Sequence, residues 1–102
     1  MIYRLERLEL EWMKASYTFE LQTGVKLVRV AVGEDKPILV IANPVNVDEA
    51  EAGQTQSFCV FFLSLREGQD MAEIDDSQTL RHLGYIKRPL TTLDWDVFEV
   101  IP

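Results

Sequence analysis

The residues best suited to covalent or metal chemistry are few and stand far apart in the sequence. Cys59 is the single cysteine and His82 the single histidine. A thiol, an imidazole and a nearby acid could form a catalytic triad. Cys59, however, lies in an apolar run at residues 58–62, which is typical of a small buried residue. No CxxC or HExxH motif is present, so we predict no catalytic residue, no metal site and no cofactor.

Two further patterns bear on enzymatic chemistry. Asp94 and Asp96 flank Trp95, and paired carboxylates can carry out acid–base catalysis. The same alternation is typical of a strand with one face in water, and we favour that interpretation. The five glycines stand singly, so no phosphate-binding loop is expected. The sequence therefore favours a protein that is not an enzyme.

The negative charge of the chain is concentrated in one region. The formal net charge is -7, and residues 45–80 hold eight acids against one base, Arg66. The loops predicted at 45–56 and 66–79 could serve only to keep the protein soluble, could bind a divalent metal, or could bind a basic partner. The spacing does not match an EF-hand loop. The acidic candidates for binding are Asp48, Glu49, Glu51, Asp70, Glu73, Asp75 and Asp76.

The most basic stretch is residues 81–88. If it is extended, Arg81, Tyr85 and Lys87 share one face, and Arg88 follows them. Arginine beside an aromatic ring can bind a nucleotide through its phosphate and its base. Edge strands also carry such charges to prevent aggregation. Because the chain as a whole is acidic, nucleic acid is not an expected direct partner.

Alternating apolar residues predict strands along most of the chain. Residues 25–32 and 38–42 form a predicted hairpin around the turn at 33–36, with Val28, Val30 and Val32 on one face. Residues 2–14 fit either a strand or a helix, and we favour a strand at 2–10. A short helical turn is expected near Ser77–Leu80. The other predicted strands are 16–21, 57–65, 81–87 and 95–101.

These elements predict a mainly β fold. We expect residues 1–102 to form one antiparallel β-sandwich or small barrel of six to seven strands, with at most one short helix. Three runs, at 25–32, 38–42 and 58–65, are apolar on both faces. Either a second sheet or a second subunit must cover them, and we expect a homo-oligomer. No apolar run reaches the roughly 20 residues that cross a membrane, and the single cysteine fits a reducing cytoplasm.

The order of short motifs resembles a family of short, uncharacterised bacteriophage and prophage proteins, classed as a domain of unknown function. The matching motifs are an aromatic-basic opening, a glycine-led strand, an aliphatic strand ending in Asn-Pro, an aromatic strand, a Leu-Gly-Tyr-Ile strand and a closing Val-Phe-Glu. They lie at residues 2–4, 24–30, 39–44, 57–58, 80–86 and 96–100. The family's Gly-Thr-Gly-His-Pro segment is replaced by residues 64–70. The resemblance implies a phage accessory protein in a bacterial cytoplasm.

Three functional hypotheses follow from the sequence. The first is a non-enzymatic phage-type protein that binds and inhibits a basic host protein, for which a bacterial defence component is one candidate. The second is an oligomeric sponge that sequesters a nucleotide signal through Arg81, Tyr85, Lys87 and Arg88. The third is a structural role in the virion. The oligomeric state is the most informative single observation, because a monomer would require one chain to bury both faces of the apolar strands.

Overall fold

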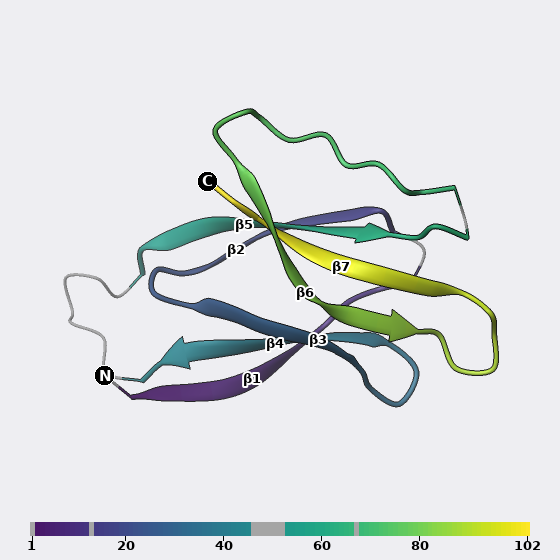
Figure 1. The fold of residues 1–102 in the computed structure, drawn as a ribbon. Coiled ribbons are helices and arrows are strands. Elements are labelled where there is room, and N and C mark those ends of the chain that lie inside the picture. Colours follow the sequence, from purple (N-terminus) through teal and green to yellow (C-terminus); the bar gives the residue numbers. More distant parts are fainter. Residues whose placement is uncertain (1, 13, 46–52, 67) are drawn as a thin grey trace.

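The computed structural model describes residues 2–12, 14–45, 53–66 and 68–102. Within these residues, seven antiparallel strands form two sheets that pack as a sandwich (Figure 1). The three-stranded sheet has the order β1-β4-β3 and the four-stranded sheet the order β2-β5-β7-β6. The strands are β1 (Tyr3–Glu9), β2 (Ser16–Gln22), β3 (Lys26–Val32), β4 (Pro37–Pro44), β5 (Thr55–Leu63), β6 (Thr79–Lys87) and β7 (Asp94–Ile101).

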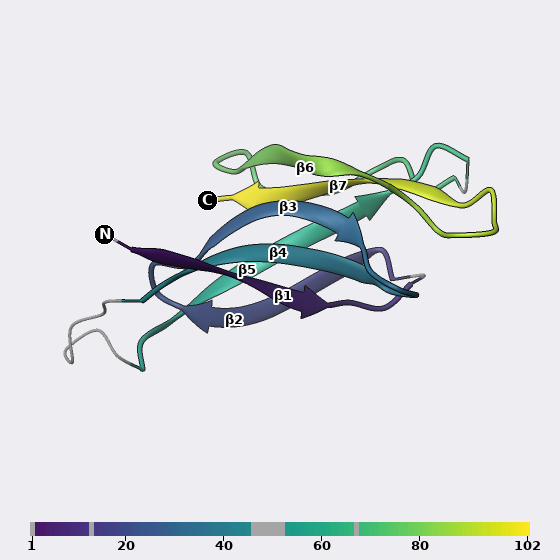
Figure 2. The same ribbon diagram turned by 90° about the horizontal axis from the view of Figure 1, so that it is seen from below.

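This arrangement confirms the predicted mainly β, antiparallel fold and selects the sandwich over the closed barrel. The ambiguous first segment is the strand β1, as favoured. The short helix expected near Ser77–Leu80 is wrong: a turn at residues 76–77 leads directly into β6. No helix in the described ranges is long and apolar enough to span a membrane. Figure 2 shows the strands of the two sheets running obliquely to each other, as twisted packed sheets do.

The core lies between the inward faces of the two sheets. Leu27 and Leu39 of the three-stranded sheet meet Val60, Phe62 and Val97 of the four-stranded sheet, and each is at most 2% exposed. In β5 the alternation is regular, because Phe58, Val60 and Phe62 all point inward. Burial of each large apolar side chain contributes about 1.5–3 kcal/mol, so these alternating positions hold the sheets together.

A β-bulge changes the expected faces of β3. The register with β4 shifts between Leu27 and Arg29, so Leu27 and Val30 both point into the core, while Val28 is 43% exposed. The prediction that Val28, Val30 and Val32 share one face is therefore wrong. The extra residue in a bulge reverses the side-chain alternation beyond it.

The central strand β4 is buried on both faces within a single chain. Leu39 and Ile41 join the core, while Ile38 and Val40 point outward yet are 6% and 8% exposed. Val40 stands between Arg7 of β1 and Arg29 of β3 in the register. The aliphatic stems of long charged side chains can cover apolar neighbours in this way. The apolar residues of β4 therefore do not require a second subunit.

A second bulge lies in β6, between His82 and Gly84. Gly84 has a φ of +146°, and a Cβ there would lie 3.1 Å from Cγ1 of Val30 in β3. Glycine suits this position because it tolerates the positive φ and lacks the Cβ that would crowd Val30. The close approach brings β6 against β3, at the side where the two sheets meet.

Gly84→Ala should lower the free energy of unfolding by about 1–3 kcal/mol, because the backbone strain and the contact with Val30 act together. Urea unfolding followed by circular dichroism measures the change. Gly68→Asn is the matched control: Gly68 also has a positive φ, of 69°, but no atom lies within 4 Å of its would-be Cβ, and asparagine tolerates that conformation. Equal effects of the two substitutions would contradict the close approach.

Candidate functional site

Two aspartates and two partners from the neighbouring strand project from the outer face of the four-stranded sheet. Trp95 points into the core at 2% exposure, so Asp94 and Asp96 on either side of it point outward, as the alternation predicts. β6 pairs with β7 through the turn at 88–93 and places Tyr85 opposite Asp96 and His82 opposite Phe98. The hairpin thus gathers polar groups that lie up to 14 residues apart in sequence.

Each of these aspartates has a partner. The Tyr85 hydroxyl donates a hydrogen bond to Oδ2 of Asp94 at 2.7 Å, and Nε of Arg66 lies 3.8 Å from the same oxygen. Nε2 of His82 lies 2.9 Å from Oδ1 of Asp96. The two carboxylates are therefore fixed in position beside each other on an accessible surface. Fixed carboxylates of this kind present acceptors to a basic ligand.

The hydrogen bond to Asp94 raises the pKa of Tyr85 above its ordinary value of 10.0, with burial and the negative charges of Asp94 and Asp96 acting in the same direction and Arg66 in the opposite one. Because the folded-state pKa is raised, the stabilising contribution is complete below about pH 10. It is lost as the pH rises from the unfolded-state pKa through the folded-state pKa.

Asp94→Asn should therefore lower the pKa of one tyrosine in an alkaline titration followed by ultraviolet absorbance. The asparagine keeps an oxygen acceptor but removes the negative charge and the charge-assisted hydrogen bond. Tyr85→Phe identifies the titrating group, because it should delete the component that moves. Superimposable titrations of the wild type and Asp94→Asn would contradict the assignment of the Tyr85–Asp94 bond.

Two adjoining hollows lie beside these aspartates, and together we call them the acidic groove. One, of about 200 Å³, is lined by Leu63, Leu65, Asp70, Asp96 and Phe98. The other, of about 190 Å³, shares Leu63, Leu65 and Asp96 and adds Ser64, Arg66, Tyr85, Asp94 and Trp95. The lining of the acidic groove therefore combines apolar side chains with carboxylates. Each hollow is smaller than the roughly 300–1,000 Å³ of a typical small-molecule pocket.

The segment between β5 and β6 borders the acidic groove. It runs along the four-stranded sheet on the side away from the three-stranded sheet (Figure 1). Of the predicted acidic residues, Asp70 lines the groove, and Glu73, Asp75 and Asp76 are exposed on the same segment. Leu65 and Met71 are 85% and 87% exposed. Asp48, Glu49 and Glu51 lie outside the described residues.

The predicted nucleotide-binding residues are not brought together. The prediction that Arg81, Tyr85 and Lys87 share one face is wrong, because the bulge in β6 reverses the alternation between Arg81 and Tyr85. Arg81 points inward, Tyr85 and Lys87 point outward, and the Arg88 guanidinium lies 5.7 Å from the ring centre of Trp12. These cations therefore do not form a single site that could bind one phosphate group together.

Arg81 links the two sheets. Its guanidinium donates two hydrogen bonds to Oε1 of Glu99, at 2.6 and 3.1 Å, and one to the carbonyl oxygen of Leu27 in β3, at 2.5 Å. Glu99 is 6% exposed. A hollow of about 510 Å³ at this end of the sandwich is lined by both residues. Because Glu99 neutralises Arg81 there, the hollow is poorly suited to an anionic nucleotide.

The thiol–imidazole pair suggested by the sequence does not form. Phe98 stands directly opposite both Phe61 of β5 and His82 of β6, so β7 separates Cys59 from His82 by two strand spacings, about 10 Å. Among the residues that the structure describes, no three His, Cys, Asp or Glu side chains gather as metal ligands.

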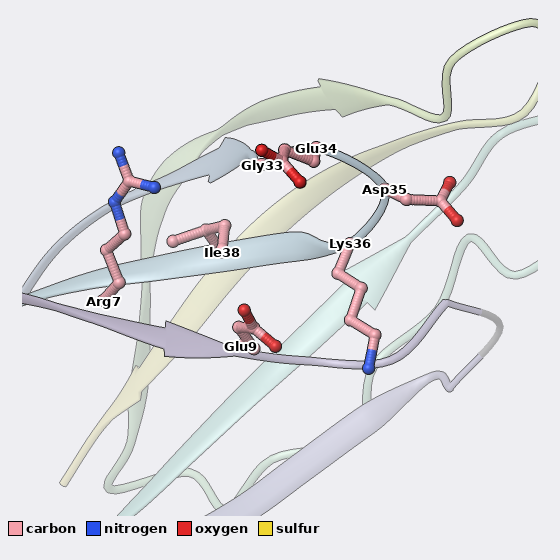
Figure 3. A pocket seen from close by; sticks show the side chains of 7 residues that line it. All are labelled: Arg7, Glu9, Gly33, Glu34, Asp35, Lys36 and Ile38. Carbon is pink, nitrogen blue, oxygen red and sulfur yellow. The ribbon is translucent and has the colours of Figure 1, made fainter.

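A further hollow, of about 430 Å³, lies on the outer face of the three-stranded sheet (Figure 3). It is lined by Arg7, Glu9, Gly33, Glu34, Asp35, Lys36 and Ile38. Asp35 points away from it in Figure 3, and Nζ of Lys36 lies 3.2 Å from Glu11, which is not part of the lining. The charges are of both signs and do not converge, so we favour the acidic groove as the functional site.

Comparison with family models, curated proteins and solved structures finds no match for this chain. The resemblance to short phage proteins therefore stays a prediction. Sequence reasoning found Asp70 and Tyr85 but missed Asp96, Phe98 and Leu63 as neighbours of those residues. The available signal was the turn at 88–93, from which the pairing of β6 with β7 could be counted residue by residue.

Proposed function

We propose that this chain is a non-enzymatic binding protein that holds a partner protein in its acidic groove. The observation that supports this most is the exposure of Leu65 and Met71 on a segment that also carries Asp70, Glu73 and Asp75. Exposed apolar side chains that form one patch with a polar rim mark interaction surfaces, and we infer that Leu65 and Met71 belong to such a patch. The partner expected from this chemistry has a basic surface with apolar residues at its centre.

The two kinds of residue have different roles in this proposal. The carboxylates steer a basic partner towards the groove and fix its orientation. Leu65 and Met71 supply affinity, because burial of each contributes about 1.5–3 kcal/mol. In the setting that the phage resemblance implies, the partner is a protein of the bacterial host cytoplasm, such as a defence component, and the complex inhibits it.

The test is the capture of a partner from a bacterial lysate by the tagged full chain. We expect a protein retained in a fixed molar ratio at low salt and released at high salt, since exposed charges are screened. Asp70→Lys/Glu73→Lys should lose it. The matched control, Glu34→Lys/Asp35→Lys, makes the same change in net charge at exposed positions on the turn between β3 and β4 and should retain it.

Two results would refute the proposal. One is that no protein is retained by the wild type at low salt. The other is that the groove variant and the turn variant retain the same protein equally, which would make the interaction a response to net charge. Leu65→Ser/Met71→Ser, which changes no charge, should also reduce retention, and an unchanged amount would remove the apolar part of the argument.

A further inference from the structure

The first strand leaves one of its edges open for pairing. β4 is the one neighbour of β1 among the described strands, and β1 forms the border of the three-stranded sheet (Figure 1). The carbonyl of Ile2 accepts from Val45, and the amide of Leu10 donates to Pro37. Even-numbered residues therefore direct their backbone groups towards β4. Because backbone groups alternate along a strand, those of Tyr3, Leu5 and Arg7 point to the open edge.

The side chains of β1 are also unusually accessible. Tyr3, Arg4, Leu5, Glu6 and Arg7 are all exposed, and Leu5 is 65% exposed. Tyr3, Leu5 and Arg7 lie on the outer face of the sheet, whereas Arg4 and Glu6 lie on the face that also carries Leu8. An open edge with an exposed leucine at its centre is a template for another strand.

The side chains on either side of Leu5 are complementary to those of a second copy of the strand that runs antiparallel to the first. When a second copy of the strand is aligned antiparallel about Leu5, Arg4 stands opposite Glu6 and Tyr3 stands opposite Arg7. A two-fold axis relates the two copies, so each of these pairs occurs twice. The axis passes through Leu5, which therefore lies opposite Leu5 of the second copy. We propose that β1 pairs in this register with β1 of a second copy, so that three strands from each copy form one continuous sheet.

Each contact in this register is favourable. Arg4 and Glu6 are opposite charges in a closely spaced, non-hydrogen-bonded pair. Tyr3 presents a ring to the guanidinium of Arg7, and this ring already attracts a cation, because Nζ of Lys26 lies 5.6 Å from its centre. Tyr3 and Arg7, like the two Leu5 residues, can exchange both backbone hydrogen bonds, since all of these groups point outward.

Registers shifted to a neighbouring charged residue place like charges opposite each other. The open backbone groups belong to odd-numbered residues, so odd must pair with odd. Moving the axis to Glu6 brings two Glu6 carboxylates together. Moving it to Arg4 or to Arg7 brings two identical guanidinium groups together. A register centred on Leu8 avoids like charges but aligns β1 only over residues 7–9. Like charges directly opposite are destabilising, so the charges favour the register about Leu5 among those that align at least five residues of β1. This pairing uses no residue of the acidic groove and does not depend on the proposed partner.

The test is the mass of the full chain in solution, by light scattering across a concentration series. We expect the wild type to reach twice the mass of one chain. Arg4→Glu places a second carboxylate opposite Glu6, and Glu6→Arg places a second guanidinium opposite Arg4, so each substitution should weaken the dimer by at least about tenfold. Circular dichroism and thermal unfolding check that each variant is folded.

Mixing the two single variants provides the decisive result. A chain with acids at both positions and a chain with bases at both positions are complementary in the proposed register. We therefore expect a one-to-one heterodimer that is tighter than the homodimer of either single variant. The double variant Arg4→Glu/Glu6→Arg should dimerise like the wild type. Arg29→Glu, which lies on β3 and away from the edge, should leave the dimer intact.

A wild type that stays monomeric at every concentration would overturn the proposal, as would a mixture of the two single variants that forms no heterodimer. A third variant tests the backbone pairing separately. Leu5→Pro removes an amide that points to the open edge and leaves the hydrogen bonds between β1 and β4 in place. It should abolish the dimer, and a Leu5→Pro dimer as tight as that of the wild type would also contradict the pairing.

Discussion

Arg81→Ala should lower the free energy of unfolding by about 3 kcal/mol, because it leaves the carboxylate of Glu99 buried without its cation. The side chain of Glu99 is 8% exposed and that of Arg81 is 51% exposed, so water can reach the site in part, and we expect the lower end of the range for broken buried pairs. The substitution also removes the donor to the Leu27 carbonyl oxygen. The melting temperature should fall by roughly 10–20 °C.

Two variants isolate the cause of this effect. Lys36→Ala breaks the exposed pair between Lys36 and Glu11, whose side chains are 48% and 67% exposed, and should cost less than about 1 kcal/mol. Arg81→Met/Glu99→Leu removes both charges of the buried pair and should recover most of the loss. If Arg81→Ala is no more destabilising than Lys36→Ala, Arg81 does not stabilise the packing of the two sheets. Arg81 would then again be a candidate for ligand binding.

Trp95→Ala should be the most destabilising of the substitutions considered, at about 3–5 kcal/mol, since it leaves a large cavity in the core. The indole is 2% exposed and is stacked on Trp12, with ring centres 5.3 Å apart. Trp12 in turn donates a hydrogen bond from Nε1 to the carbonyl oxygen of Asp35, at 2.8 Å. Trp95 therefore connects the outer aspartates of β7 to the turn between β3 and β4.

Urea unfolding followed by circular dichroism measures this loss. Trp12→Phe is the control, because it keeps an aromatic ring against Trp95 and removes one hydrogen bond, for which about 1 kcal/mol is expected. Because Trp95 lies between Asp94 and Asp96, its removal should also weaken partner binding in the acidic groove. An unfolding midpoint that is unchanged by Trp95→Ala would contradict the packing of the two sheets around this residue.

Sequence reasoning succeeded where strand alternation runs without interruption. In β5, where a strand was predicted at 57–65, Phe58, Val60 and Phe62 alternate regularly onto one face, and in β7 the side chains alternate around Trp95 as predicted. It failed in β3 and β6, because each contains a bulge. One extra residue reverses the faces that follow, and apolar residues on both sides of β3 give no sign of where this happens. In β6 the isolated Gly84 was an available sign of irregular pairing.

The candidate site was predictable in its charge and not in its geometry. The concentration of acids at 66–79 identified the segment that borders the groove, and composition alone sufficed for that. Asp70 lines the same hollow as Asp96 and Phe98 because of the path that its segment takes along the sheet, and no local sequence pattern encodes that path. The bond from Arg81 to Leu27 joins two sheets and residues 54 positions apart, so its structural role could not be read from a basic stretch.

The most direct test of the central claim, that a partner binds in the acidic groove, is amide hydrogen exchange of the chain alone and in complex with the captured partner. Self-association protects the same amides in the free chain and in the complex, so the difference in exchange between the two states reports partner binding alone. We predict slower exchange on binding at residues 63–71 and 94–98, with no change at residues 26–42. Protection confined to the three-stranded sheet, with the groove exchanging as in the free chain, would contradict the account.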